Sequence, residues 1–227
     1  MLSVEHLRYA GDECLQLLLH LINKMISDVK CLSSSSLNTA IATPIHKGKD
    51  KPYNSHKSYR MVRVQPLISR IFDEHLRPDL IKLNKNIQNE NQYGFTQGIS
   101  YLMAALQRHE AKSFCIDNKK TFFCVTLDGE IAFDVVSRSI LTRELYCTAK
   151  ETGQFWLAEK FQYENTLTRI KYNNYISSTL EEHLGVKQGN SKSSDHYKIY
   201  NKSLLDSVDE ANLGIQIGPV IASQNIC

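Results

Sequence analysis

Residues 122–136 read FFCVTLDGEIAFDVV, and this stretch decides the expected fold. The run 121–127 is nearly continuous in apolar, β-forming side chains, which predicts a central strand covered on both faces. Asp128 ends this strand, and a carboxylate on a rigid mount can hold magnesium for phosphoryl transfer. An ordinary strand, followed by a helix that Asp134 caps, explains the same residues. The stretch alone leaves both interpretations open.

The composition is that of a globular protein. Of the 227 residues, 42% are hydrophobic and 22% are charged, which excludes disordered, collagen-like and coiled-coil chains. The apolar run 17–22 is too short to span a bilayer, and the N-terminal residues do not resemble a secretory leader. Six scattered cysteines form no Cys-x-x-Cys pair. We therefore expect an intracellular protein of the cytoplasm or nucleus, not a secreted one, with reduced thiols.

Positive charge is concentrated in one part of the chain. The net charge of +3 is small, but residues 46–70 carry seven Lys and Arg side chains against one acid, Asp50. Such a cluster is suited to phosphate groups, which supply most of the sequence-independent affinity for nucleic acids. A solvated basic loop is the alternative.

Hydrophobic periodicity and turn residues predict a chain of alternating helices and strands. Helices are expected over 4–29 with a break at Gly11, from Pro66 to Arg77 just before Pro78, and over 99–112, 137–150, 153–163 and 193–208. Leu67, Ile71, His75 and Leu76 form the expected buried side of the second helix. Strands are expected over 39–45, 60–65 and 214–221, with a hairpin over 167–179 that turns at Asn173-Asn174.

Several short motifs follow one another in a specific order. They are VEHLRYAG at 4–11, PIHKGK at 44–49, SYR at 58–60, LISRIF at 67–72, QYGF at 92–95, LDGEIAFDVV at 127–136 and GVKQG at 185–189. In this order they resemble the reverse-transcriptase domain of non-LTR (LINE-type) retrotransposons along almost the whole chain. The resemblance implies an α/β (α+β) fold, helix-rich with a small central mostly antiparallel sheet. It also implies right-hand polymerase fingers over 1–120 and a partial palm over 121–227.

The resemblance further implies an RNA-directed DNA polymerase that uses two magnesium ions, an RNA template, a DNA primer and deoxynucleotide triphosphates. Asp128 would bind both ions, with the backbone carbonyl of Gly129 helping. Phe133 would lie beneath the incoming sugar and exclude a 2′-hydroxyl. The remaining nucleotide-binding residues would be Arg60 with Lys47 or Lys49 on the triphosphate, and Gln188 and Gly189 at the pocket border.

Each of these roles has an ordinary structural alternative. Phe133 also fits a core aromatic between a strand and a helix, and Lys187 and Gln188 also fit an exposed turn. Asp134 is assigned to helix capping and not to metal binding. Glu130 follows the point where the chain leaves the strand and is not expected to replace a metal ligand.

The chain departs from the family pattern in its carboxylates. Two ions about 3.5–4 Å apart need more than one carboxylate, and the sequence contains no Asp-Asp dipeptide. It reaches Cys227 about where the aromatic-x-Asp-Asp hairpin is expected, so we expect a truncated domain that is inactive alone. Thr96 and the loop Asn190–Ser194 also differ from the family, which usually has arginine and small apolar residues there.

Three hypotheses remain open at this point. The first is a reverse-transcriptase fragment. The second is a non-catalytic nucleic-acid-binding module that uses Lys47, Lys49, Arg60 and Arg63, or an inert retroelement remnant if nucleic acid is not bound. The third is an unrelated α/β enzyme in which Asp128 ends a strand by coincidence.

Overall fold

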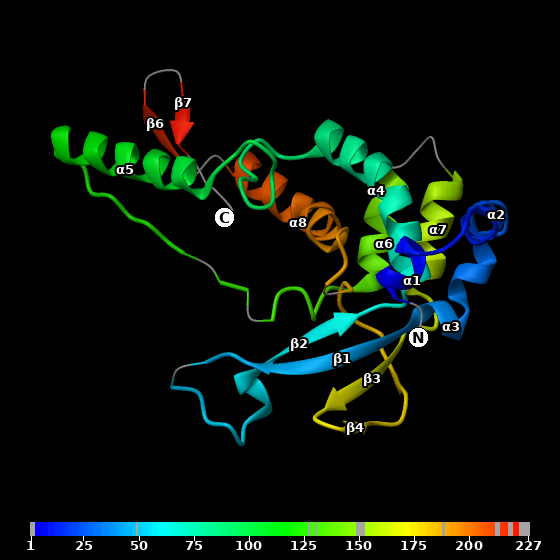
Figure 1. Ribbon diagram of the computed structural model, residues 1–227. Coiled ribbons are helices and arrows are strands. Elements are labelled where there is room, and N and C mark those ends of the chain that lie inside the picture. The colour runs from blue at the N-terminus through cyan, green and yellow to red at the C-terminus, as the bar shows by residue number, and fades with distance from the viewer. Residues whose placement is uncertain are drawn as a thin grey trace.

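The computed structural model describes residues 3–48, 50–126, 128–129, 131–148, 153–187, 189–211, 214–217 and 220–222. They form a mixed α/β protein in which helices lie over one face of a small sheet (Figure 1). In the described part of the chain, no helix is both long and apolar enough to cross a membrane. The five cysteines described there are free thiols.

The main sheet has five strands and mixed topology. Its members are β1 (Thr39–His46), β2 (Tyr59–Val64), β3 (Leu167–Tyr172), β4 (Tyr175–Ile176) and β5 (Leu180–Glu181). β1 pairs antiparallel with β2 and parallel with β3, and β3 pairs antiparallel with β4 and β5. The expected hairpin is confirmed, since Asn173 has the left-handed φ of 52° that such a tight turn requires. The sheet is thus mixed: three of its four pairings are antiparallel, in agreement with the expectation, and the β1–β3 pair is parallel.

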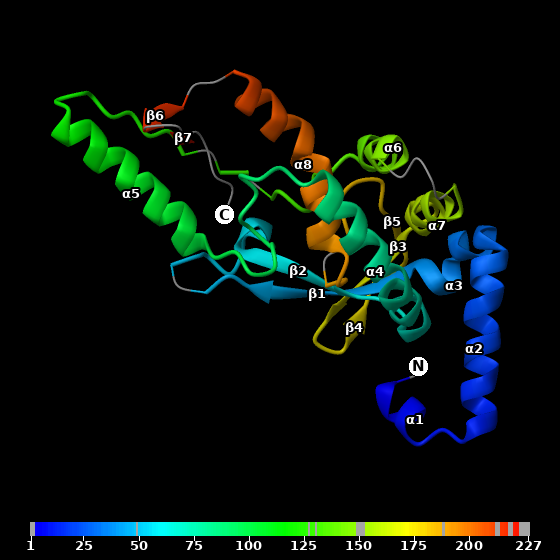
Figure 2. The same cartoon turned by 90° about the horizontal axis from the view of Figure 1, so that it is seen from above.

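The predicted helices are confirmed apart from their bounds. They are α1 (Val4–Arg8), α2 (Asp12–Ser27), α4 (Leu67–Ile87), α5 (Tyr101–Asp117), α6 (Arg138–Thr148), α7 (Gly153–Tyr163) and α8 (Ser193–Glu210), whereas the short helix α3 (Ser35–Asn38) was not predicted. Gly11 precedes α2 in an extended conformation, so the first helix breaks at the expected residue. α2 and α5 lie at opposite ends of the molecule (Figure 2). β6 (Ile215–Ile217) and β7 (Val220–Ala222) form a separate hairpin that contacts α5.

Helix α4 does not end before Pro78, as the sequence had suggested. It continues for nine residues beyond Pro78, to Ile87, although a proline inside a helix costs about 3 kcal/mol. The exposed Pro78 faces solvent, while Phe72, Leu76 and Leu80 are buried on the other side. Burial of this apolar face outweighs the lost hydrogen bond. His75, which was expected on the buried side, is exposed.

The hydrophobic core lies among the helices and covers only part of the sheet. Its centre includes Phe72, Leu80, Leu141, Leu145 and Ile199 from α4, α6 and α8. In β1 the first half is covered, with Ala40 and Ala42 buried, whereas Ile45 near its end is 51% exposed. The β1–β2 hairpin therefore extends beyond the helical layer.

The predicted central strand at 121–127 is wrong for its described residues. Residues 121–126 are extended and have no strand partner in the described chain, and Phe123 and Val125 are more than 80% exposed. The centre of the sheet is instead formed by β1 and β3, which pair with each other, with β2 and with β4 and β5, and residues 121–126 pair with none of these strands. Leu127 lies outside the described residues. The division at residues 120 and 121, like the assignment of fingers and palm, stays a prediction.

Candidate nucleic-acid interface

The far end of the β1–β2 hairpin carries a group of exposed cations. Arg60 on β2 pairs with Ile45 on β1, and the connecting loop adds three lysines: Lys47, Lys51 and Lys57. All four side chains are exposed, and none forms an ion pair with another described residue. The predicted phosphate-binding residue Lys49 lies outside the described residues. We call these four residues the hairpin cations.

Aromatic packing and backbone hydrogen bonds order this loop. The His46 ring stacks on the Tyr53 ring with centroids 4.2 Å apart and an interplanar angle of 14°. The Tyr59 hydroxyl donates to the Tyr53 carbonyl at 2.9 Å, and the Lys47 amide donates to Ser58 at 2.8 Å. Tyr53 is nevertheless 78% exposed. The loop that carries the hairpin lysines thus also carries a fixed, exposed aromatic ring, which was not predicted from the sequence.

Arg63 does not belong to the accessible basic surface. Its guanidinium lies 2.8 Å from Asp134 and 2.8 Å from Glu182 in a partly buried position. Burial by itself lowers the pKa of Arg63, but the two carboxylates outweigh it and the pKa is raised. Asp134 was expected to cap a helix; it binds Arg63, and α6 begins four residues later at Arg138. Arg63 therefore has a structural role, contrary to its place in the nucleic-acid-binding hypothesis.

Asp128 lies on an exposed segment and not at the end of a buried strand. Its side chain is exposed, and the neighbouring Gly129 approaches Ala132 and the Tyr197 hydroxyl of α8. Within the described ranges, no three His, Cys, Asp or Glu side chains are grouped so as to hold a metal ion. A single exposed carboxylate does not meet the geometry of two ions about 3.5–4 Å apart. Among the described residues, this part of the chain does not fit the expected magnesium pair.

Phe133 packs against two aromatic residues, one from helix α8 and one from the QYGF motif. Its ring stacks on Tyr197 of α8 with centroids 4.8 Å apart and meets the Phe95 ring edge-on at 6.0 Å. Phe95 belongs to the QYGF motif, so two of the motifs are in contact. Half-burial between aromatic rings is what a packing residue would show. Its role beneath a sugar stays a prediction.

The loop 185–189, which we call the glycine loop, packs directly on residues 133–136 of the LDGEIAFDVV motif and on β2. The Gly185 amide donates to Val136 at 2.8 Å, and the Val186 amide donates to Phe133 at 2.9 Å. Gly185 and Gly189 have φ of 84° and 91°, and a Cβ on Gly189 would run into the Arg63 carbonyl oxygen. Gln188 lies outside the described residues. Three motifs that are distant in sequence thus share one packed region.

A buried ion network lies beneath this loop. The Lys192 ammonium is 2.9 Å from Asp73 of α4 and 2.7 Å from Glu159 of α7, and all three side chains are almost inaccessible. His196 is 3.1 Å from Glu159, and its Nδ1 is 2.9 Å from the Tyr163 hydroxyl. Burial opposes ionisation of Glu159, but Lys192 and His196 outweigh it and lower its pKa to about 2. We call these five residues the Lys192 network.

Lys187 is buried beside this network and is not an exposed turn residue. Its ammonium lies 3.3 Å from the Asn38 side chain and 5.6 Å from the centre of the Tyr163 ring. Burial lowers the pKa of Lys187 to about 8, an effect that Asp73 partly offsets. The Lys192 network was not predicted from the sequence, although Lys192, His196 and Ile199 follow the i, i+4, i+7 spacing of one helical face.

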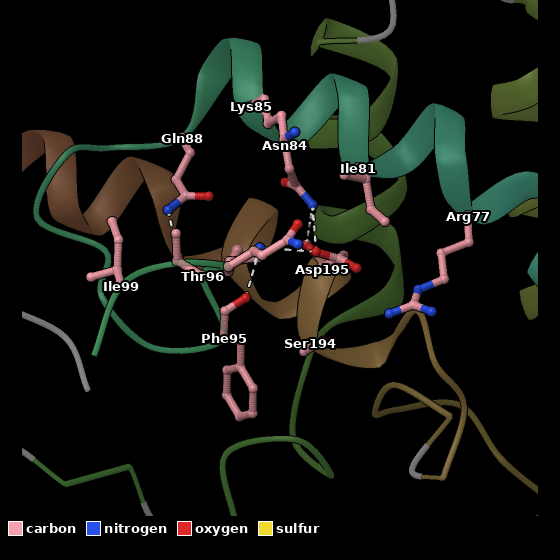
Figure 3. A pocket seen from close by; sticks show the side chains of 12 residues that line it. Arg77, Ile81, Asn84, Lys85, Gln88, Phe95, Thr96, Ile99, Ser194 and Asp195 are labelled. Atoms are coloured by element: carbon pink, nitrogen blue, oxygen red, sulfur yellow. Dashed lines mark hydrogen bonds and ion pairs between the residues drawn. The ribbon is translucent and has the colours of Figure 1, made fainter. Parts of the chain in front are cut away.

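A hollow of about 600 Å³ lies between α4, the loop 88–99 and the first turn of α8 (Figure 3). It is separate from the hairpin cations, and its walls mix charged, amide and apolar side chains.

Comparisons with known protein families and with curated proteins find no match to this chain.

Proposed function

We propose that the chain binds single-stranded nucleic acid, with RNA as the expected partner, through the β1–β2 hairpin. The observation that carries this proposal is the ordered hairpin loop, in which the exposed Tyr53 ring and the hairpin cations, which form no ion pair with another described residue, lie on one short segment of the chain. Cations that track the backbone, together with an aromatic ring on which a base stacks, are the usual elements of single-strand binding.

The exposed charge is available because little inside the protein competes for it. The Lys47 ammonium donates to the Lys57 carbonyl at 2.7 Å, which fixes its position but leaves its charge uncompensated. Asp50 is the one acid in the described part of the loop. Phosphates that replace counterions at these side chains would supply affinity that falls steeply with salt.

A reverse-transcriptase-like origin is the second part of the proposal. The packing of residues 133–136 against the loop 185–189 supports it, because the resemblance assigns Phe133 and that loop to one nucleotide pocket, and Phe95 of the QYGF motif contacts the same region. A DNA primer, deoxynucleotide triphosphates and magnesium would belong to that ancestral activity. Since Asp128 is a single exposed carboxylate, we propose that the chain alone does not synthesise DNA.

Fluorescence anisotropy with a labelled single-stranded RNA of about 20 nucleotides tests the binding. We expect the logarithm of the association constant to fall with the logarithm of salt concentration with a slope of about −3, at about 0.7 for each of four contacts. The variant with Lys47, Lys51, Lys57 and Arg60 all changed to Glu should lose binding. Absence of binding at about 50 mM salt would leave an inert remnant.

A control of the same composition separates local contacts from net charge. Lys24, Lys30, Arg108 and Lys112 are exposed and lie on or beside α2 and on α5, away from the hairpin. Their combined change to Glu alters the net charge by the same amount, and we expect binding to be largely retained. Equal loss in both variants would contradict a hairpin site.

Primer extension tests the second part. A DNA primer annealed to an RNA template should not be extended by this chain in magnesium with deoxynucleotide triphosphates. Extension that Asp128→Ala abolishes would contradict the proposed inactivity and support a working polymerase site.

A further inference from the structure

We propose that the hollow between α4, the loop 88–99 and α8 binds a phosphate monoester that carries an apolar or ring-bearing body. The volume of about 600 Å³ is typical of small-molecule pockets, which span roughly 300–1,000 Å³. None of the lining residues belongs to β1 or β2. The proposal is therefore independent of the nucleic-acid interface.

The floor of the hollow is a buried group of polar side chains that is already neutralised. The Asn84 amide donates to Asp195 at 3.1 Å, and the Lys198 ammonium lies 2.9 Å from the same carboxylate oxygen. Lys198 also donates to the Phe95 carbonyl at 3.3 Å. Figure 3 shows Asn84 of α4 pointing toward Asp195 across the hollow. Because Asp195 is paired with Lys198, the floor does not compensate charge on the walls.

The wall formed by α4 carries the uncompensated positive charge. Arg77, Ile81 and Lys85 follow at spacings of four and lie on one face of the helix. Lys85 forms no ion pair with another described residue, and the nearest acid to Arg77 is Glu74 at 3.6 Å, a half-exposed contact. The Arg77 Nε has no hydrogen-bond partner among the described atoms. This wall therefore has donors and charge to spare for an anion.

The spacing of the two cations fits a phosphate group between them. Their Cα atoms are about 12 Å apart along the helix, at about 1.5 Å for each residue, and both side chains are long enough to reach a common point. An arginine guanidinium binds phosphate through two parallel hydrogen bonds. Ile81 lies between the two cations on α4, and Ile99 lines the hollow from the loop 88–99. An apolar body attached to the phosphate could therefore contact both isoleucines.

Isothermal titration calorimetry with three probes tests the site: phenyl phosphate, inorganic phosphate and phenol. We expect phenyl phosphate to bind more tightly than inorganic phosphate and phenol not to bind. Arg77→Gln and Lys85→Gln should each weaken phenyl phosphate binding about tenfold or more, as expected for loss of a charged hydrogen bond. Lys82→Gln is the matched control, since Lys82 is exposed on the same helix but does not line the hollow.

Three results would overturn the proposal. They are a dissociation constant for phenyl phosphate weaker than about 1 mM, equal affinity for phenyl phosphate and inorganic phosphate, and equal weakening by Lys82→Gln. Thermal unfolding of each variant separates loss of the site from misfolding, and we expect little change in stability because the Arg77 side chain is half-exposed and Lys82 and Lys85 are exposed. The four-residue hairpin variant should bind phenyl phosphate normally, which separates this site from the nucleic-acid interface.

Discussion

The Lys192 network and the hairpin cations use the same kind of side chain in opposite surroundings. Lys192 is almost completely buried and contacts two carboxylates from two helices, whereas Lys47, Lys51 and Lys57 are exposed and unpaired within the described chain. In a poorly polarisable interior, opposite charges attract each other strongly, and removal of one partner strongly destabilises the folded protein. In water the same charges interact weakly with the protein and remain free to bind phosphates.

This difference teaches that the two regions should respond to different experiments. Substitutions in the Lys192 network should change the free energy of unfolding, because the network joins α4, α7 and α8. Substitutions on the hairpin should change nucleic-acid binding with little effect on stability.

The largest expected effect belongs to Lys192→Met. The substitution leaves Asp73 and Glu159 buried without their cation, and breaking a buried pair in this way destabilises a protein by about 3–5 kcal/mol. Urea unfolding followed by circular dichroism measures the loss. Lys202→Met is the matched control on α8, where a partly exposed ion pair with Asp206 should contribute less than about 1 kcal/mol.

A combined variant identifies the cause of that loss. If unpaired carboxylates are responsible, Asp73→Asn and Glu159→Gln added to Lys192→Met should recover part of the stability. Similar small losses for Lys192→Met and Lys202→Met would remove the distinction between the buried network and the surface.

The second prediction concerns acid. The pKa of Glu159 is about 2 in the folded chain against an ordinary value of 4.5, so on acidification the unfolded chain takes up the proton first. Its contribution is present above about pH 4.5 and is lost as the pH falls toward 2, at about 1.4 kcal/mol for each pH unit, or about 3 kcal/mol in all. Unfolding free energies at pH 5 and pH 2.5 measure the loss.

Two variants decide whether Glu159 causes this acid sensitivity. Glu159→Gln should remove that part of the pH dependence, although it also lowers stability at neutral pH. Asp50→Asn on the exposed hairpin loop should leave the dependence in place. An unchanged acid loss in Glu159→Gln would show that other groups dominate.

The third prediction compares two glycines with the same backbone conformation. Gly189 and Gly48 have φ of 91° and 88°, so alanine costs about 1–2 kcal/mol in conformation at either position. At Gly189 the new methyl also meets the Arg63 carbonyl oxygen, whereas at Gly48 it would meet no described atom within 4 Å beyond its chain neighbours. We expect Gly189→Ala to destabilise the protein by about 1–3 kcal/mol more than Gly48→Ala in urea unfolding. Equal losses would mean that the loop can shift away from β2.

The parts of the fold that the sequence predicted correctly depend on local signals. Gly11 interrupts the first helix and Asn173 turns the β3–β4 hairpin, and both effects need only the residue and its neighbours. The strand predicted over 121–127 is wrong for residues 121–126, because the apolar β-forming character of a segment does not reveal whether it pairs with another strand. Helix α4 passes through Pro78 because burial of Phe72, Leu76 and Leu80 outweighs the local preference.

The candidate sites show the same division between local and distant information. The basic loop was visible in the sequence as a charge cluster. Lys47 and Arg60 were predicted as individual phosphate contacts, whereas Lys51 and Lys57 were only counted as members of the cluster. Arg63 was misassigned because its partner Asp134 lies 71 residues away. The Lys192 network was missed since its acids lie on two other helices, and the helical spacing of Lys192 and His196 marks a shared face but does not identify the partners of that face.

The smallest expected effect on stability belongs to Tyr53→Ala in the hairpin. Tyr53 is 78% exposed and stacks on one side against His46, so the unfolding free energy should fall by less than about 1 kcal/mol. Affinity for single-stranded RNA should fall more, by about 1–3 kcal/mol if one base stacks on the ring. Because no charge is removed, the slope with salt should stay unchanged, unlike that of the charge-reversal variant. Tyr53→Phe keeps the ring and should bind normally, whereas a changed salt slope in Tyr53→Ala would mean that the ring only positions the cations.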